Sequence, residues 1–271
     1  MQSTKILFCD FDGTLFSKDK RIARKDIKIL RHLNDLDIIR VIATGRSYFS
    51  IRKVIPEDFP IDYIILSSGA GIMDWKAKRL LKTETIKGVL ADQIIDRLLK
   101  NDIPFFVQDP LPNNHLGYFF LNQNHNPDFV RRLNLYPDEL KPIAERKAQS
   151  DASQFVLIRQ NPSEIEELLR DWLEEIHFVK ATSPIDHKTI WLEIFPHGVS
   201  KARAAAYLCD HLNIHPSASM AVGNDFNDLD LLQWAARSFV MPDSPQLLLQ
   251  KFPVLRLRDD SVLASLNFSR P

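Results

Sequence analysis

The chain has few of the features expected of a secreted, membrane-bound or nucleic-acid-binding protein. Its two cysteines, Cys9 and Cys209, are too few for a disulfide framework or a cysteine metal cluster. No apolar run approaches membrane-spanning length, and the N-terminal apolar stretch is too short for a secretory signal. Lys+Arg and Asp+Glu both number 35, so no net charge favours nucleic acid or an acidic membrane. We therefore expect a cytoplasmic protein that binds neither.

The remaining composition is that of an ordinary globular chain. Apolar residues make up 45% and charged residues 26% of 271 residues, enough for a substantial core and for two domains. Cys9 lies in an apolar run and Cys209 in a predicted helix, so we expect both to be buried as small hydrophobic side chains. Repeats and low-complexity tracts are absent.

Both ends of the chain alternate strand and helix patterns. Apolar, often β-branched runs predict strands at 6–9, 37–43, 62–66, 219–222 and 238–241. Helical spacing and start signals predict helices at 24–35, 47–54, 200–212 and 228–236. This alternation implies a parallel sheet with right-handed crossovers.

The middle of the chain has a different pattern. We expect helices at 83–100 and 161–176 among strands at 105–107, 118–121, 155–158, 178–181 and 190–195. The predicted fold class is therefore α/β, a Rossmann-like doubly wound parallel sheet formed by 1–74 and 186–271, with an inserted α+β domain at 75–185. A polar loop in the insert is either a solvated hairpin connection, the simpler interpretation, or a surface that recognises a sugar. Its polar residues are Gln108, Asn113, Asn114 and His115.

Two carboxylates, Asp10 and Asp12, directly follow the first predicted strand and stand beside Gly13. Carboxylates are hard oxygen ligands, and Mg²⁺ is usually held by one or two of them plus substrate phosphate oxygens. Asp10 is also a candidate nucleophile and Asp12 a candidate acid. The alternative is an Asp-rich turn that closes a strand, since Asp and Gly are common turn residues.

Three further segments carry polar groups suited to an anion or a cation. The run Thr44-Gly45-Arg46 follows a predicted strand and precedes a helix, where backbone N–H groups, a hydroxyl and a guanidinium suit a phosphate. Lys201 begins a helix, a position unfavourable for a cation unless an anion lies there. The run 223–228 places four oxygen-bearing side chains after a strand. The simpler interpretations of these three segments are, in the same order, a helix cap, a surface lysine and a polar turn.

These four segments, in this order, resemble the motifs of the haloacid dehalogenase superfamily, specifically its Cof-type phosphatases with a large, type-2 cap. The resemblance implies that Asp10 attacks phosphorus to form an aspartyl-phosphate and that Asp12 acts as acid and then as base. It further implies that the insert is a cap that selects the substrate. Residues implied to bind phosphate are Thr44, Gly45 and Lys201, with Arg46 on the substrate. Residues implied to hold Mg²⁺ are Asp10, Asp12 through its carbonyl, Asn224 and Asp228, of which Asp228 would either support the metal through water or orient Lys201.

Two positions depart from the family pattern. Asn224 stands where an aspartate is usual, so the metal site loses an anionic ligand unless Asp225 supplies one. Ser68 stands where the family has an asparagine.

The predicted function is a Mg²⁺-dependent phosphatase acting on small phosphorylated metabolites, such as a sugar phosphate, as a monomer or small homo-oligomer. The alternatives are a sugar phosphomutase of the same fold and a non-catalytic binding or regulatory protein.

Overall fold

The computed structural model describes residues 3–123, 125–159, 161–183 and 189–268. The chain forms two compact units. The core unit comprises Met1–Arg46, Val54–Thr83 and Ser200–Pro271. The inserted unit comprises Ser47–Lys53 and Glu84–Val199. In the described part of the chain, no helix combines the length and the apolar character needed to cross a membrane.

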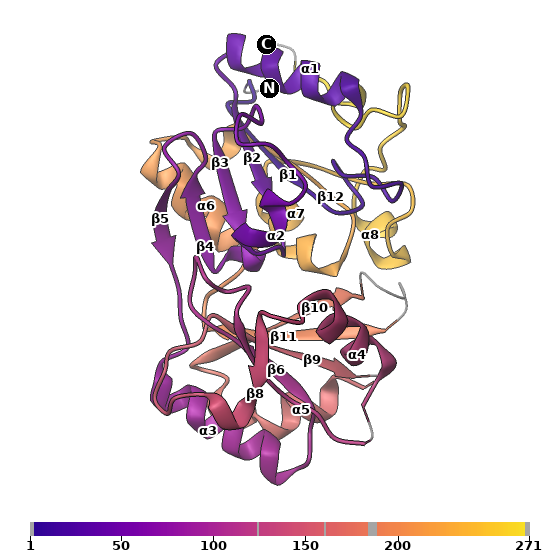
Figure 1. The fold of residues 1–271 in the computed structure, drawn as a ribbon. Coiled ribbons are helices and arrows are strands. Elements are labelled where there is room, and N and C mark those ends of the chain that lie inside the picture. Colours follow the sequence, from indigo (N-terminus) through magenta and orange to yellow (C-terminus); the bar gives the residue numbers. More distant parts are fainter. Residues whose placement is uncertain (1–2, 124, 160, 184–188, 269–271) are drawn as a thin grey trace. The chain divides into compact units, whose positions relative to one another are not determined.

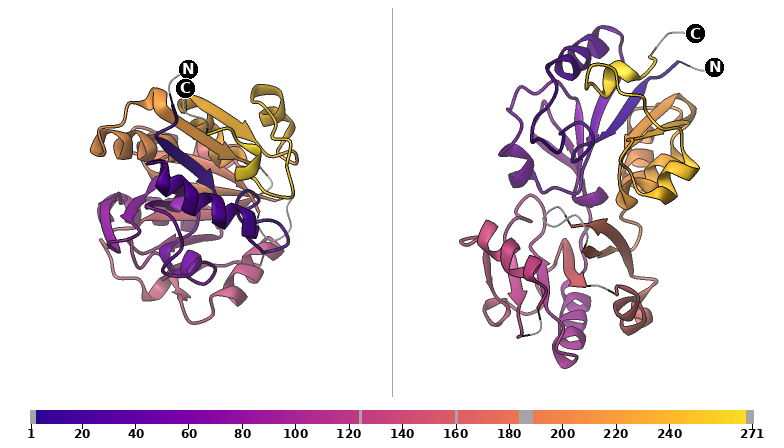
Figure 2. Two further views of the ribbon diagram at one scale, coloured as in Figure 1. Left: turned by 90° about the horizontal axis from the view of Figure 1, so that it is seen from above. Right: turned by 90° about the vertical axis from the view of Figure 1, so that its right-hand side faces the viewer.

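A seven-stranded sheet forms the centre of the core unit (Figure 1). Its strands are β1 (Ile6–Asp10), β2 (Ile39–Ala43), β3 (Tyr63–Leu66), β4 (Gly71–Asp74), β5 (Arg79–Thr83), β12 (Ser219–Gly223) and β13 (Arg237–Val240). They lie in the order β13-β12-β1-β2-β3-β4-β5. The first five are parallel, whereas β4 and β5 are antiparallel. Both ends of the chain share this sheet, which Figure 2 shows as indigo strands beside orange ones.

Helices pack on both faces of this sheet. They are α1 (Arg24–Asp35), α6 (Lys201–His211), α7 (Leu229–Trp234) and α8 (Gln246–Lys251). Ile6, Phe8 and Val41 on one face form a single core cluster with Leu208 of α6 and Leu231 of α7. Helix α1 contacts β2 and lies on the other side of the sheet (Figure 2). The predicted α/β class with a parallel sheet core is thus confirmed, and both cysteines are buried as expected.

Strands β4 and β5 differ from the sequence prediction. The helix expected at 83–100 begins at Gly88, because the chain first returns along β4 and continues the core sheet through Thr83. The division between units therefore falls after Thr83 rather than after the expected residue 74. The second division falls after Val199, since β11 (Ile190–Pro196) pairs within the inserted unit. The expected boundary at 185/186 lies outside the described residues.

The inserted unit contains a six-stranded, mainly antiparallel sheet. Its other strands are β6 (Phe105–Gln108), β7 (Gly117–Phe120), β8 (Leu140–Pro142), β9 (Gln154–Arg159) and β10 (Ile176–Thr182), in the order β10-β11-β9-β6-β7-β8. Its helices are α2 (Tyr48–Arg52), α3 (Gly88–Lys100), α4 (Pro127–Leu135) and α5 (Ser163–Leu168). The core cluster around Phe105 and Phe155 includes α3 side chains, while Phe106 packs with Phe129 of α4.

Several details of this unit were not predicted. The helix expected at 161–176 ends at Leu168, because the chain must enter β10 at Ile176. Helix α4 and strand β8 were missed, as was α8 in the core unit. The polar loop is not simply solvated: Gln108 and Asn114 are buried, and the His115 ring stacks on Phe49 with centroids 4.2 Å apart.

Candidate active site

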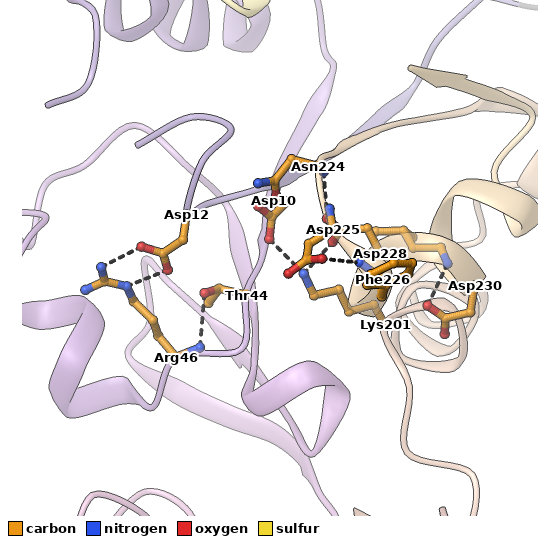
Figure 3. A network of polar contacts seen from close by, with 11 residues as sticks. Asp10, Asp12, Thr44, Arg46, Lys201, Asn224, Asp225, Phe226, Asp228 and Asp230 are labelled. Atoms are coloured by element: carbon orange, nitrogen blue, oxygen red, sulfur yellow. Dashed lines mark hydrogen bonds and ion pairs between the residues drawn. The ribbon is translucent and has the colours of Figure 1, made fainter. Parts of the chain in front are cut away.

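Asp10, Lys201 and Asp228 form a buried ion-paired network in the core unit (Figure 3). Asp10 is the last residue of β1 and is 5% exposed. Lys201 Nζ lies 2.7 Å from Asp10 Oδ1 and 2.5 Å from Asp228 Oδ1. Two carboxylates therefore share one ammonium group away from bulk water, and its loss would leave two buried charges without a cationic partner.

The first turn of α6 holds Lys201 in this position. Ser200 caps the helix, and its hydroxyl accepts the backbone N–H of Arg203. Asp230 Oδ2 accepts the backbone N–H of Ala202 at 3.0 Å. A carboxylate at a helix N-terminus is favourable, and here it offsets the unfavourable placement of a lysine. Sequence reasoning did not identify Asp230, although the acidic run that ends at Asp228 continues to it.

Burial and neighbouring charges shift the proton affinity of this network. Burial alone would lower the pKa of Lys201, but the carboxylates of Asp10 and Asp228 outweigh it and hold the pKa above its ordinary value. Burial raises the pKa of Asp10 to about 7, and the charge of Asp228 adds to this effect while Lys201 opposes it. The network therefore has more negative charge than one ammonium neutralises, which favours a further cation beside Asp10.

The turn after β12 is organised by Asp228. Its Oδ2 accepts the backbone N–H groups of Asn224 at 2.8 Å and of Asp225 at 3.1 Å. The Asp225 carboxylate accepts the backbone N–H of Phe226 and caps the short helix that follows. Gly223 permits this close approach, since a Cβ there would lie 2.6 Å from Asp228 Oδ2. Asp228 thus directs both oxygens to donors within the protein.

The Asn224 side chain reaches the other oxygen of Asp10. One face of its carboxamide lies against Asp10 Oδ2 and the backbone carbonyl of Asp12. With the amide nitrogen on that face, it donates to both oxygens at 3.1 Å; in the other orientation, the amide oxygen faces the same two acceptors. Of the two candidates after β12, the structure therefore brings Asn224 to Asp10.

Asp12 directs its carboxylate to Arg46. Arg46 Nε donates to Asp12 Oδ2 at 2.7 Å and Nη2 donates to Oδ1 at 2.6 Å. The guanidinium also lies near the rings of Phe11 and Phe16, which stack on each other. The Asp12 side chain is 48% exposed, so this pair is partly accessible to solvent.

Thr44 is buried after β2, and its hydroxyl accepts the backbone N–H of Arg46 at 3.1 Å. A hydroxyl that accepts one hydrogen bond keeps its own proton for another acceptor. Gly45 lies beside Ser68 and Asn227, since a Cβ there would be 3.5 Å from Ser68 Oγ and 3.7 Å from Asn227 Nδ2. These groups form a set of donors near the predicted phosphate position.

The turn after β3 contacts the backbone of Ser200, the residue before Lys201. Ser67, Ser68 and Gly69 all have positive φ angles. Such a conformation is costly for non-glycine residues and is most often retained at functional sites. A Cβ on Gly69 would lie 2.4 Å from the carbonyl oxygen of Ser200, so only glycine lets this turn touch the start of α6.

The oxygen groups available to a metal are mixed in type. No group of three or more His, Cys, Asp or Glu side chains suited to a metal ion occurs among the described residues. The groups that meet are instead the Asp10 carboxylate, the Asp12 carbonyl and the Asn224 carboxamide. Carboxylate, carbonyl and amide oxygens suit a hard cation such as Mg²⁺.

Comparison with known proteins agrees with the motif pattern. A family model described as haloacid dehalogenase-like hydrolase matches residues 7–255. An HMP-PP phosphatase of Yersinia enterocolitica is 23% identical over 257 residues, covering 92% of this chain and 87% of that protein. A second HMP-PP phosphatase, from Yersinia pseudotuberculosis, is 24% identical over 255 residues, with the same shares of both chains covered.

Solved structures show the same fold. A haloacid dehalogenase-like hydrolase from B. subtilis superposes with a TM-score of 0.73 at 21% identity, covering 93% of this chain and 94% of that one. A sugar phosphatase of haloacid dehalogenase subclass IIB superposes with a TM-score of 0.72 at 18% identity, covering 93% and 92%.

Proposed function

The chain belongs to the haloacid dehalogenase-like hydrolase family, and we propose that it is a Mg²⁺-dependent phosphatase of small phosphorylated metabolites, acting through an aspartyl-phosphate on Asp10. The observation that supports this proposal most directly is the placement of Asp10. One of its oxygens is held by Lys201, and the other faces the Asn224 carboxamide, which also contacts the Asp12 carbonyl. A carboxylate that an ammonium group holds on one oxygen and a carboxamide contacts on the other is fixed in direction for nucleophilic attack on phosphorus.

The reaction we propose has two displacements at phosphorus. An oxygen of Asp10 forms a bond to phosphorus as the ester P–O bond breaks, and Asp12 gives its proton to the leaving alkoxide. Water then attacks the phosphorus of the aspartyl-phosphate and passes a proton to Asp12, so that inorganic phosphate leaves and Asp10 is regenerated. The same carboxylate serves as acid and then as base because the two steps run in opposite senses.

The residues proposed to stabilise the phosphoryl group surround Asp10. Lys201 Nζ contributes a fixed positive charge, and the Thr44 hydroxyl and the backbone at Gly45 contribute hydrogen-bond donors. Donors fixed before the reaction stabilise the charge of the transition state without reorganisation. We propose that Arg46 orients Asp12, since its guanidinium contacts that carboxylate. Contact of Arg46 with the substrate remains a prediction.

Mg²⁺ is proposed to bind Asp10 Oδ2, the Asp12 carbonyl and Asn224 Oδ1. When bound, it would neutralise charge on the phosphoryl oxygens. Adjacent ligands of an octahedral Mg²⁺ lie about 3 Å apart, given metal–oxygen distances of about 2.1 Å. The separation of 3.1 Å between the Asn224 amide and each of the other two oxygens fits this requirement. Asp228, with both oxygens bound to protein donors, supports Lys201 and the turn.

Substrate choice is proposed to depend on the inserted unit, the counterpart of the cap in the resemblance. The names of the relatives suggest two classes of substrate to test, sugar phosphates and HMP-PP. The Asp12 carboxyl favours an ester with an alcohol leaving group, because that oxygen needs a proton as it departs.

The first experiment is phosphate release from a generic aryl phosphate, with and without Mg²⁺, by the wild type and by Asp10→Asn. We expect Mg²⁺-dependent release that Asp10→Asn abolishes. Asp58→Asn, a change at an exposed carboxylate of the core unit, should retain full activity. Equal release by Asp10→Asn and the wild type would contradict the nucleophile assignment. Transfer of phosphate to a sugar without release would indicate the phosphomutase instead.

A further inference from the structure

Two orientations of the Asn224 carboxamide fit the same space and would have opposite consequences. Turned one way, its nitrogen donates to Asp10 Oδ2 and to the Asp12 carbonyl, and both acceptors are satisfied without an ion. Turned the other way, three oxygens meet, an arrangement that requires a cation between them. A carboxylate at this position would lack the first orientation, because it has no N–H to donate.

The surroundings of Asn224 confine its side chain to this place. Its backbone N–H is held by Asp228 Oδ2, and the Asp228 carboxylate is fully buried. On its other side the amide closely approaches Gly13, where a Cβ would lie 2.3 Å from Asn224 Nδ2. Gly13 has a φ of 78°, so the loop reaches this position in a conformation that favours glycine. Exchange of the amide oxygen and nitrogen changes the hydrogen bonding but hardly changes the shape.

We propose that the Asn224 carboxamide substitutes for the cation when none is bound, and that Mg²⁺ binds only as the amide turns its oxygen toward Asp10 and Asp12. This inference rests on the proposed function, since it assumes that the cation site lies beside Asp10. Two consequences follow. The metal-free protein has a satisfied site, and Mg²⁺ binding is weakened because it must displace two hydrogen bonds and gains no charge from residue 224.

The test compares Mg²⁺ affinity, by calorimetric titration, with melting temperature in EDTA. Asn224→Asp has nearly the same shape but an added negative charge beside Asp10. We expect it to bind Mg²⁺ at least about tenfold more tightly, because an opposite charge at ligand distance is added, and to melt below the wild type in EDTA. Asn224→Ala removes both donor and ligand, so it should melt lower in EDTA and also bind Mg²⁺ more weakly.

Asn227→Asp is the matched control, because it adds the same charge within the same turn. It should change both quantities less than Asn224→Asp does. Tighter Mg²⁺ binding by Asn224→Asp with wild-type melting in EDTA would overturn this inference alone. If neither the wild type nor Asn224→Asp binds Mg²⁺, both this inference and the proposed metal dependence are overturned. The melting comparison uses no substrate, so it stands apart from any result on phosphate release.

Discussion

Arg46 holds the carboxylate of Asp12 with two parallel hydrogen bonds, 2.7 Å from Nε to Oδ2 and 2.6 Å from Nη2 to Oδ1. The two residues are 34 positions apart and follow neighbouring parallel strands, β1 and β2. A bidentate pair of this kind fixes the direction of a carboxylate. We therefore propose that Arg46 is a positioning residue for Asp12, the proposed acid and base.

If Arg46 positions Asp12, its loss should lower kcat more than it raises KM. We expect Arg46→Gln to reduce kcat by about tenfold or more, in the range lost when general acid–base catalysis is impaired. Arg46→Lys should recover only part of the rate, because an ammonium cannot make the bidentate contact. Steady-state kinetics on an aryl phosphate measure the separate effects on kcat and KM, with Arg203→Gln, a change at an exposed residue, as control. A large rise in KM with unchanged kcat would instead support contact with substrate.

Loss of the Lys201 charge should affect both stability and rate. Lys201→Met keeps the approximate length of the side chain but leaves the buried carboxylates of Asp10 and Asp228 unpaired. Removing one partner of a buried ion pair costs about 3–5 kcal/mol of unfolding free energy. Loss of a fixed transition-state charge should reduce kcat by about 10²–10³-fold. Urea unfolding and kinetics test both, with Arg203→Met as control; unchanged stability would contradict the paired network.

The contact of Gly69 with the start of α6 predicts a long-range effect. Gly69→Ala places its Cβ methyl group 2.4 Å from the Ser200 carbonyl oxygen, on a residue whose φ is 113°. Both are unfavourable, and we expect a loss of about 2 kcal/mol or more in unfolding free energy. The displaced helix start should also lower kcat through Lys201. Ala70→Gly provides a comparison at the next residue, and a fully active Gly69→Ala would show that α6 is not displaced.

A second buried ion pair, away from the site, makes the free energy of unfolding depend on pH in the acid range. Arg40 donates to both oxygens of Asp62, from Nε at 2.7 Å and from Nη2 at 2.6 Å. Burial would raise the pKa of Asp62, but these bonds and that from Lys76 outweigh it and lower the pKa below 3.8. Because the pKa is lower in the folded state, this contribution to stability is complete above about pH 4. It is lost as pH falls through the folded-state value.

Asp62→Asn should therefore cost about 2–3 kcal/mol of unfolding free energy at pH 7, somewhat less than a fully buried pair. The difference from wild type should shrink as pH falls below 4. Urea unfolding at several pH values measures it, with Asp19→Asn at an exposed carboxylate as control. A difference that stays constant down to pH 2 would show that the charge of Asp62 is not its cause.

The strands that carry the site were predictable because their signal is local. Residues 6–9 form a continuous apolar run buried on both faces of a parallel sheet, and Asp10 interrupts that run where the strand ends. The order of the four motifs likewise needs no tertiary information. Strand β5, by contrast, has no fully buried residue and carries charged residues at 79 and 82, so its sequence lacks a strand pattern. Its pairing with β4, rather than its composition, makes it a strand.

The amino-acid sequence by itself determined which side chains follow the core strands and the α/β class that brings those strand ends to one edge. Only the tertiary structure decided which of these side chains contact one another. Lys201 joins Asp10 across 191 residues, Arg46 pairs with Asp12, and the amide of Asn224 lies against Asp10. The reason is physical: hydrophobic periodicity and turn chemistry act between near neighbours in the chain. Hydrogen bonds and ion pairs depend on positions within a few tenths of an ångström, which the packing of distant segments sets.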